Sequence, residues 1–145
     1  MIPAADPTAG QFCVTVDLAN ELDIGASELR RIPPEKIRRV QLSAVVNSGA
    51  PRLVIPASVA EELGLPLAAM KALRRYPDGR TAIRPITEYV RLSYGGRSSV
   101  FNAVVDAECR QPLMGAIVLE ELDFLVDAAN GQLVPRDPNG IISDI

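Results

Sequence analysis

Apolar and polar residues alternate near the start of the chain. Between Gln11 and Leu18 every second residue is apolar, a period typical of a strand with one buried face. The segment from Val40 to Val46 ends in the apolar run Ala44-Val45-Val46, which predicts a strand buried on both faces. A tight turn and the short apolar run Leu53-Val54-Ile55 follow. This part of the pattern therefore predicts short strands rather than long helices.

Two stretches depart from the strand pattern in the first half of the chain. A helix is expected at residues 56–63, with Gly64 placed to end it. Residues 20–35 are polar and contain two consecutive prolines, so we expect a connection with a helical turn at residues 26–31. Residues 67–76 are ambiguous, because residues 67–73 have good intrinsic helix propensity but a hairpin turn signal follows them at residues 77–80.

The second half of the chain is expected to form hairpins joined by glycine-containing turns. Residues 73–86 predict a hairpin with its tip at Asp78-Gly79, a pair that tight hairpin turns favour. The other expected elements are a hairpin of residues 88–94 and 98–105 around Gly95-Gly96, a strand at residues 112–115, a helix at residues 117–122, and a last hairpin around Asn130-Gly131.

Many short strands with few short helices predict an all-β, barrel-like fold. The length of 145 residues and the 48% hydrophobic composition suit one domain with a sizeable core. We expect a loose N-terminal leader at residues 1–10, the domain at residues 11–136 and a C-terminal tail at residues 137–145.

Composition narrows the chemistry. The chain contains no histidine, which excludes Ser-His-Asp and Cys-His catalysis and most catalytic zinc sites, so acid-base chemistry would depend on carboxylates. The formal net charge of -3 argues against a nucleic-acid partner. The basic pairs are expected to be solvated surface residues; they are Arg30-Arg31, Arg38-Arg39 and Arg74-Arg75.

The cysteines and the N-terminus bear on the compartment. Cys13 and Cys109 are the two cysteines of the chain, and we expect both to be reduced, buried small hydrophobes, as in a cytoplasmic protein. The first ten residues lack the features of a signal peptide, and no apolar run is long enough for a membrane span. A longer natural precursor with a membrane anchor is compatible with the same sequence.

One composite motif carries the functional hypothesis. An apolar strand runs into Asn47-Ser48-Gly49-Ala50, a second short strand and a helix follow, and much later Leu113-Met114-Gly115 precedes another short helix. This order resembles the retropepsin-like (retroviral-type) aspartic proteases, in particular their bacterial single-domain members, whose mark is two apolar residues followed by Asp, Ser or Thr, Gly, and Ala or Ser. The resemblance extends from about Phe12 to Pro135 and implies a closed-barrel retropepsin fold.

The resemblance also implies a site. Position 47 is that of the catalytic aspartate, Ser48 would hold the paired loops by a hydrogen bond, and Gly49 would permit close backbone approach. Ala50 would form the floor of the cleft, and the hairpin tip would be the flap that closes over substrate. The substrate-binding candidates are Ala50, Tyr76, Pro77, Asp78, Gly79, Arg80 and Ile83, with Arg52 as a further residue of the cleft or of the dimer axis.

A single copy of the motif implies a homodimer. Aspartic proteases activate water between two carboxylates that share a proton, so the second carboxylate would come from a second copy across a two-fold axis. The implied substrate is an extended peptide or protein, and neither a metal nor any other cofactor is implied. Asp127 is instead expected to be a turn carboxylate beside Asn130-Gly131.

Asn47 departs from the family pattern at the catalytic atom. An amide cannot act as the general base, so the chain is expected to bind peptide but scarcely to cleave it. Asn47 is either an inactivating Asp-to-Asn replacement or the mark of a natural pseudoprotease that acts as a homodimeric peptide- or protein-binding β-barrel. The retained Ser48-Gly49-Ala50 and flap turn favour the first hypothesis, and they disfavour a purely structural dimerisation domain.

Overall fold

The computed structural model describes residues 11–142, so the expected leader at residues 1–10 lies outside the described residues. The strands are β1 (Phe12–Asn20), β2 (Arg39–Val46), β3 (Leu53–Pro56), β4 (Leu67–Arg75), β5 (Thr81–Tyr94), β6 (Arg97–Asp106), β7 (Leu113–Met114), β8 (Phe124–Asp127) and β9 (Gln132–Pro135). The helices are α1 (Glu21–Glu28), α2 (Ala57–Leu63) and α3 (Ala116–Leu122), and η1 (Pro34–Lys36) is a 3-10 turn.

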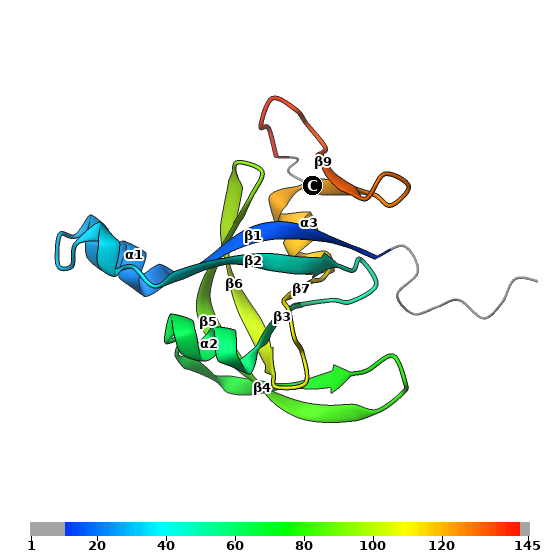
Figure 1. Ribbon diagram of the computed structural model, residues 1–145, viewed down its shortest axis with the longest axis horizontal. Helices are drawn as coiled ribbons and strands as arrows, with labels where there is room; N and C mark the ends of the chain where they lie inside the picture. Colours follow the sequence, from blue (N-terminus) through cyan, green and yellow to red (C-terminus); the bar gives the residue numbers. More distant parts are fainter. Residues whose placement is uncertain (1–10, 143–145) are drawn as a thin grey trace, which may run out of the picture.

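The main sheet closes into a barrel. Its strand order is β1-β2-β7-β3-β6-β5-β4, and β1 also pairs with β5. This second pairing joins Asp17–Asn20 to Val90–Ser93 in antiparallel register and closes the ring. Strand β4 stays outside the ring because it pairs with β5 alone. In Figure 1 the hairpin of β4 and β5 therefore reaches outward beneath the loop between β2 and β3.

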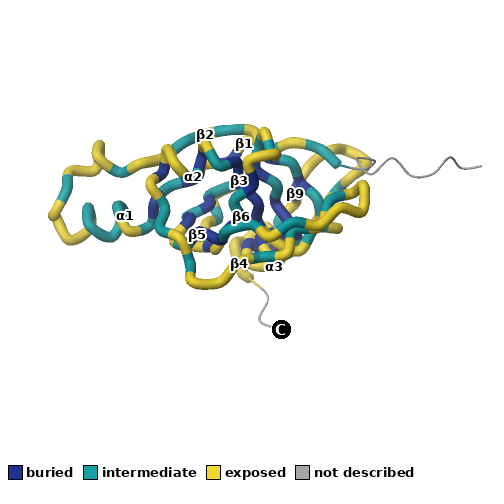
Figure 2. Tube along the Cα trace, turned by 90° about the horizontal axis from the view of Figure 1, so that it is seen from below, coloured by how far each residue is buried: buried dark blue, intermediate teal, exposed yellow. Residues whose placement is uncertain are grey.

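Period-two burial produces the core of the barrel. Val16 and Leu18 on β1 are fully buried, whereas the intervening Asp17 faces solvent. All four residues of β3 are buried, as the unbroken apolar run predicts. Figure 2 shows the buried segments gathered in the middle of the molecule, with α1 and the loop after it projecting at one end. The all-β closed barrel with short helices expected from the sequence is confirmed.

Helix α1 corrects one sequence-based expectation. The expected helical turn at residues 26–31 is instead a helix from Glu21 to Glu28. It starts early because the side chain of Asn20 accepts a hydrogen bond from the Asp23 amide at 3.1 Å, and because acidic residues lie in its first turn. The other end of the Asn20 amide donates to the Leu63 carbonyl at 2.8 Å, so one buried side chain joins α1 to α2.

Strand β4 is a case in which context overrides propensity. Residues 67–73 favour a helix in isolation, yet they form a strand paired with β5, with an irregularity between Leu67 and Lys71. The hairpin expected at residues 73–86 is present, since Leu73 pairs with Ile83 and Arg75 pairs with Thr81. Cross-strand pairing therefore decides the conformation here.

The cysteines correct another expectation. Both are free, but Cys13 is exposed and Cys109 is half-buried, so neither is the buried hydrophobe that was expected. The period-two pattern of β1 explains the exposure of Cys13, because Phe12 and Val14 pack against the core and leave Cys13 on the outward face.

Candidate functional site

The loop between β2 and β3 begins with a tight turn at Asn47. The Ala50 amide donates to the Asn47 carbonyl at 3.1 Å, and the Gly49 amide donates to Oδ1 of the Asn47 side chain at 3.0 Å. Asn47 is half-buried, whereas Ser48 and Gly49 are exposed. The turn therefore orients the amide of Asn47 by a local hydrogen bond and presents the next two residues outward.

A distant segment clamps this loop. Strand β7 lies between β2 and β3, parallel to β2 and antiparallel to β3. The amides of Gly115, Ala116 and Ile117 donate to the carbonyls of Arg52 (3.1 Å), Ala50 (2.7 Å) and Pro51 (3.1 Å), respectively. The N-terminal amides of α3, which an isolated helix leaves unpaired, thus hold the loop in place.

Gly115 is the closest point of this clamp. A Cβ atom built on Gly115 would lie 2.3 Å from the Arg52 carbonyl oxygen and 2.6 Å from that of Ala50. Only a residue without a side chain permits this approach. Leu113-Met114-Gly115, which the composite motif includes, therefore packs directly against the loop that begins at Asn47.

The hairpin of β4 and β5 turns at the residues expected for a flap tip. The Tyr76 amide donates to the Arg80 carbonyl, and the Gly79 amide donates to the Tyr76 carbonyl, both at 2.9 Å. Gly79 has a φ of 89°, which favours glycine. Asp78 accepts a hydrogen bond from the Arg80 amide at 3.0 Å. The four tip residues from Pro77 to Arg80 are all exposed.

A cavity of about 380 Å³ separates the loop from the hairpin. The Ala50-Pro51-Arg52 end of the loop forms one side and residues 71–75 of β4 form the other, with Val54 and Val104 between them. Ala50, one of the expected substrate-binding residues, therefore lines this cavity. Ile83 is 62% exposed and is not among the residues that line this cavity.

Asp106, at the end of β6, anchors the hairpin to the barrel. Its side chain is 1% exposed and accepts hydrogen bonds from the Tyr76 hydroxyl at 2.9 Å and from Nε of Arg74 at 3.3 Å. Its other oxygen accepts from the Glu108 amide at 2.9 Å. Arg74 is therefore a partner of a buried carboxylate, which corrects the expectation that the pair Arg74-Arg75 is simply solvated.

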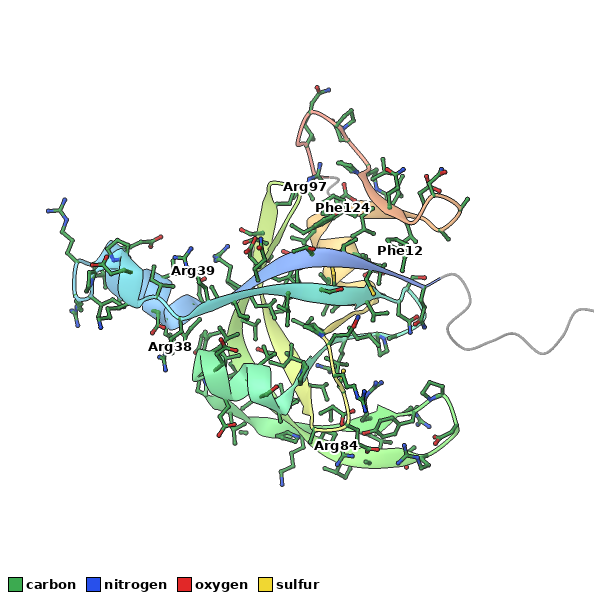
Figure 3. All side chains as sticks on the ribbon, viewed as in Figure 1. Phe12, Arg38, Arg39, Arg84, Arg97 and Phe124 are labelled. Atoms are coloured by element: carbon green, nitrogen blue, oxygen red, sulfur yellow. The ribbon has the colours of Figure 1, made fainter. Side chains whose placement is uncertain are left out.

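More arginines surround Tyr76. Arg84, labelled on the hairpin in Figure 3, donates to the Tyr76 hydroxyl at 2.9 Å and to Glu108 at 2.7 Å. The guanidinium of Arg80 lies 4.6 Å from the centre of the Tyr76 ring, a cation–π distance. Tyr76 and Arg80 were expected to be cleft residues; Tyr76 instead belongs to the Asp106 anchor, and Arg80 lies beside it.

Hydrogen bonding stabilises the charged form of Asp106. Burial by itself raises the pKa of this carboxyl. Hydrogen bonds from the Glu108 amide, from Tyr76 and from Arg74 outweigh burial and hold the pKa below its ordinary value of 3.8. Asp106 therefore stabilises the folded state while it is ionised.

We expect Asp106→Asn to lower the free energy of unfolding at pH 7 by about 2–3 kcal/mol, because an amide N–H₂ would face the donors that now meet a carboxylate oxygen. The contribution is present above the ordinary pKa of 3.8 and is lost as the pH falls through the lower value of the folded state. Urea unfolding at a series of pH values measures it.

The matched control for this prediction is Asp17→Asn, because Asp17 is an exposed carboxylate on β1. Its replacement is expected to change stability by less than about 0.5 kcal/mol. Equal stability of the Asp106→Asn variant and the unmodified chain at pH 7 would contradict the anchoring role.

Sequence reasoning missed Asp106 and Arg84. Arg74 and Tyr76 fall on the same face of a strand by their spacing, but this spacing does not identify Asp106 as their partner. Asp127 accepts hydrogen bonds from the Asn130 backbone and side-chain amides at 3.2 and 2.8 Å, as expected of a turn carboxylate.

Residues 11–142 show no group of His, Cys, Asp or Glu side chains that could hold a metal ion. In the same part of the chain, no helix is both long enough and apolar enough to cross a membrane.

No protein-family model and no curated protein matches the chain. Among solved structures, the EIAV protease complexed with the inhibitor HBY-793 is similar, with a TM-score of 0.46 at 16% sequence identity, covering 65% of this chain and 82% of that chain. The strand order of the chain itself defines an all-β closed barrel in which β7 lies between β2 and β3. This is the fold class expected of a retropepsin-like domain.

Proposed function

We propose that the chain is a retropepsin-like domain that works as a homodimer and binds extended peptides in a cleft across a two-fold axis. The observation that carries this proposal is the clamped loop at Asn47. Backbone hydrogen bonds from residues 115–117 fix the loop, and its Ala50-Pro51-Arg52 end lines a cavity whose other side is β4. A rigid loop of this kind suits a group that must be positioned accurately.

The dimer follows from the chemistry of the motif. Two carboxylates about 3 Å apart share one proton and can activate a water molecule between them. Each chain offers one residue 47, so a pair requires two chains. The exposed Ser48 and Gly49 are available to meet a second copy. In the Asp form, the reaction would be endopeptidase hydrolysis of a peptide bond without a metal or other cofactor.

The peptide would bind by strand addition. Strand β4 is the last strand of the sheet and pairs with β5 alone, so its other edge retains unpaired backbone N–H and C=O groups. The cavity extends along residues 71–75 of this strand. An extended peptide between this edge and the loop would gain main-chain hydrogen bonds, while its side chains would decide specificity.

Asn47 makes the chain a binder rather than a catalyst. Its amide is nearly the same size as a carboxylate, so the cleft keeps its shape, but it can neither hold the shared proton nor act as a base near neutral pH. We favour an inactivated protease over a natural pseudoprotease because Ser48-Gly49-Ala50 and the flap turn are retained.

Peptide cleavage by the Asn47→Asp variant tests this proposal. Hydrolysis supports the inactivated protease, and continued inertness with peptide binding retained supports the pseudoprotease. Failure of the unmodified chain to bind any extended peptide would overturn both versions.

A further inference from the structure

The cavity between the loop and β4 carries positive charge. Four basic residues are among those that line it, Arg52, Lys71, Arg74 and Arg75, and none of the described residues lining it is acidic. The remaining lining residues are apolar or are proline and alanine. The cavity therefore combines cationic side chains with an apolar base.

Most of this charge has no counter-ion within residues 11–142. Arg74 pairs with Asp106 at 3.3 Å. Arg52, Lys71 and Arg75 are exposed, and no ion pair joins them to another residue within 11–142. Neighbouring Arg80 and Arg84, by contrast, are both paired with carboxylates. Three cations without an ion pair among the described residues, Arg52, Lys71 and Arg75, thus line the proposed peptide path.

The alternation of side chains along β4 explains how these basic residues can reach one bound peptide. Lys71 and Arg75 leave one face of the strand and Arg74 leaves the other. All of them line the cavity, so the cavity follows the free edge of β4. Long basic side chains from either face can extend around that edge toward a bound strand, and Arg52 approaches from the opposite side on the loop.

The charge is local, which favours a peptide over a polyanion. The chain as a whole has a net charge of -3, so a nucleic acid would find no continuous basic surface. A cavity of about 380 Å³ is of a size to hold a few side chains rather than a phosphate backbone. The apolar residues at its base suit the methylene groups of a glutamate.

We propose that this cleft selects extended peptides that carry acidic side chains, with Arg52, Lys71 and Arg75 as the residues that determine this specificity. The proposal rests on the proposed function and specifies its substrate class. Apolar side chains remain suited to the base of the cleft, and the acidic residues occupy its cationic rim.

Binding of short fluorescent peptides to the unmodified chain tests the proposal, because Asn47 prevents cleavage during the measurement. Each peptide carries Glu at one position, and its matched partner carries Gln there. By fluorescence anisotropy, the best Glu peptide is expected to bind about fivefold to tenfold more tightly than its Gln partner at low salt. The ratio should fall as salt rises.

Variants identify the residues responsible. In a variant with Arg52, Lys71 and Arg75 all changed to Gln, the Glu-to-Gln ratio should fall to about one. The control is Arg39→Gln, because Arg39 is exposed and lies at the α1 end of the molecule, away from the hairpin (Figure 3); this variant should keep the full ratio. Thermal unfolding of each variant confirms that it folds. A variant with Arg52 and Arg75 changed to Glu should prefer a Lys peptide.

The failures are distinguishable. Equal binding of Glu and Gln peptides, or an unchanged ratio in the triple variant, overturns the acidic preference and leaves the peptide-binding function intact. Absence of binding by every peptide overturns the proposed function and this inference together. If a single-stranded oligonucleotide bound at the same residues more tightly than the Glu peptides, the acidic-peptide preference would also be overturned.

Discussion

The Asn47→Asp variant is expected to hydrolyse peptides that the unmodified chain only binds. Restoring the carboxylate on each of two chains creates a pair that can share one proton and activate water. Because the variant gains a general base, we expect its rate of peptide hydrolysis to exceed that of the unmodified chain by about 10⁴-fold. Cleavage of a peptide library, read by mass spectrometry, measures the gain and identifies the bonds that are cut.

The pH dependence provides a second signature. Two coupled carboxylates lose their protons in separate steps, and only the form with a single shared proton is active. Activity should therefore peak at acidic pH, decline on both sides and be inhibited by pepstatin. Asn47→Ala is the matched control and should be inert at every pH. If Asn47→Asp is equally inert while peptides still bind, the chain is a pseudoprotease.

Gly115→Ala is expected to have the largest effect on stability. The added Cβ would lie 2.3 Å from the Arg52 carbonyl oxygen and 2.7 Å from the Arg52 amide nitrogen. These backbone atoms cannot withdraw without loss of the hydrogen bond from Gly115 to Arg52. We expect the free energy of unfolding to fall by about 3 kcal/mol or more, or the chain not to fold.

Gly25→Ala is the control for this prediction. Gly25 lies in α1, and a Cβ atom there would have no neighbour within 4 Å. Alanine is a better helix former than glycine, so the chain should gain up to about 1 kcal/mol. Urea unfolding of both variants makes the comparison. A Gly115→Ala variant as stable as the unmodified chain would mean that the loop is not clamped by β7 and α3 as the structure has it.

The barrel was predictable because its signals are local. Alternation in β1, the buried run of β3 and the turns at Asp78-Gly79 and Gly95-Gly96 each act over a few residues. Their predicted strands and hairpins are present. The motif Leu113-Met114-Gly115 marked Gly115 as part of the site in the sequence. Its backbone contacts with Arg52 and Ala50 could be seen only in the three-dimensional structure.

The anchor at Asp106 was not predictable from such signals. It joins residues far apart in the chain, since Asp106 is hydrogen-bonded to Tyr76 and to Arg74. The spacing of apolar residues along the chain does not predict contacts between residues so far apart. The start of α1 was misplaced for a different reason. Asn20 ends a strand and caps a helix at once, and its capping role depends on a side-chain orientation that composition does not determine.

Disulfide cross-linking at position 48 tests the central claim most directly. Ser48→Cys, in a chain whose Cys13 and Cys109 are replaced by Ser, should form a covalent dimer on mild oxidation. In the proposed dimer the two loops face each other, which would bring their Cα atoms within the roughly 7 Å that a disulfide can span. Ser58→Cys, exposed on α2, is the control and should stay monomeric on a non-reducing gel. No dimer through position 48, or equal yields from both positions, would contradict a site built from two copies of this loop.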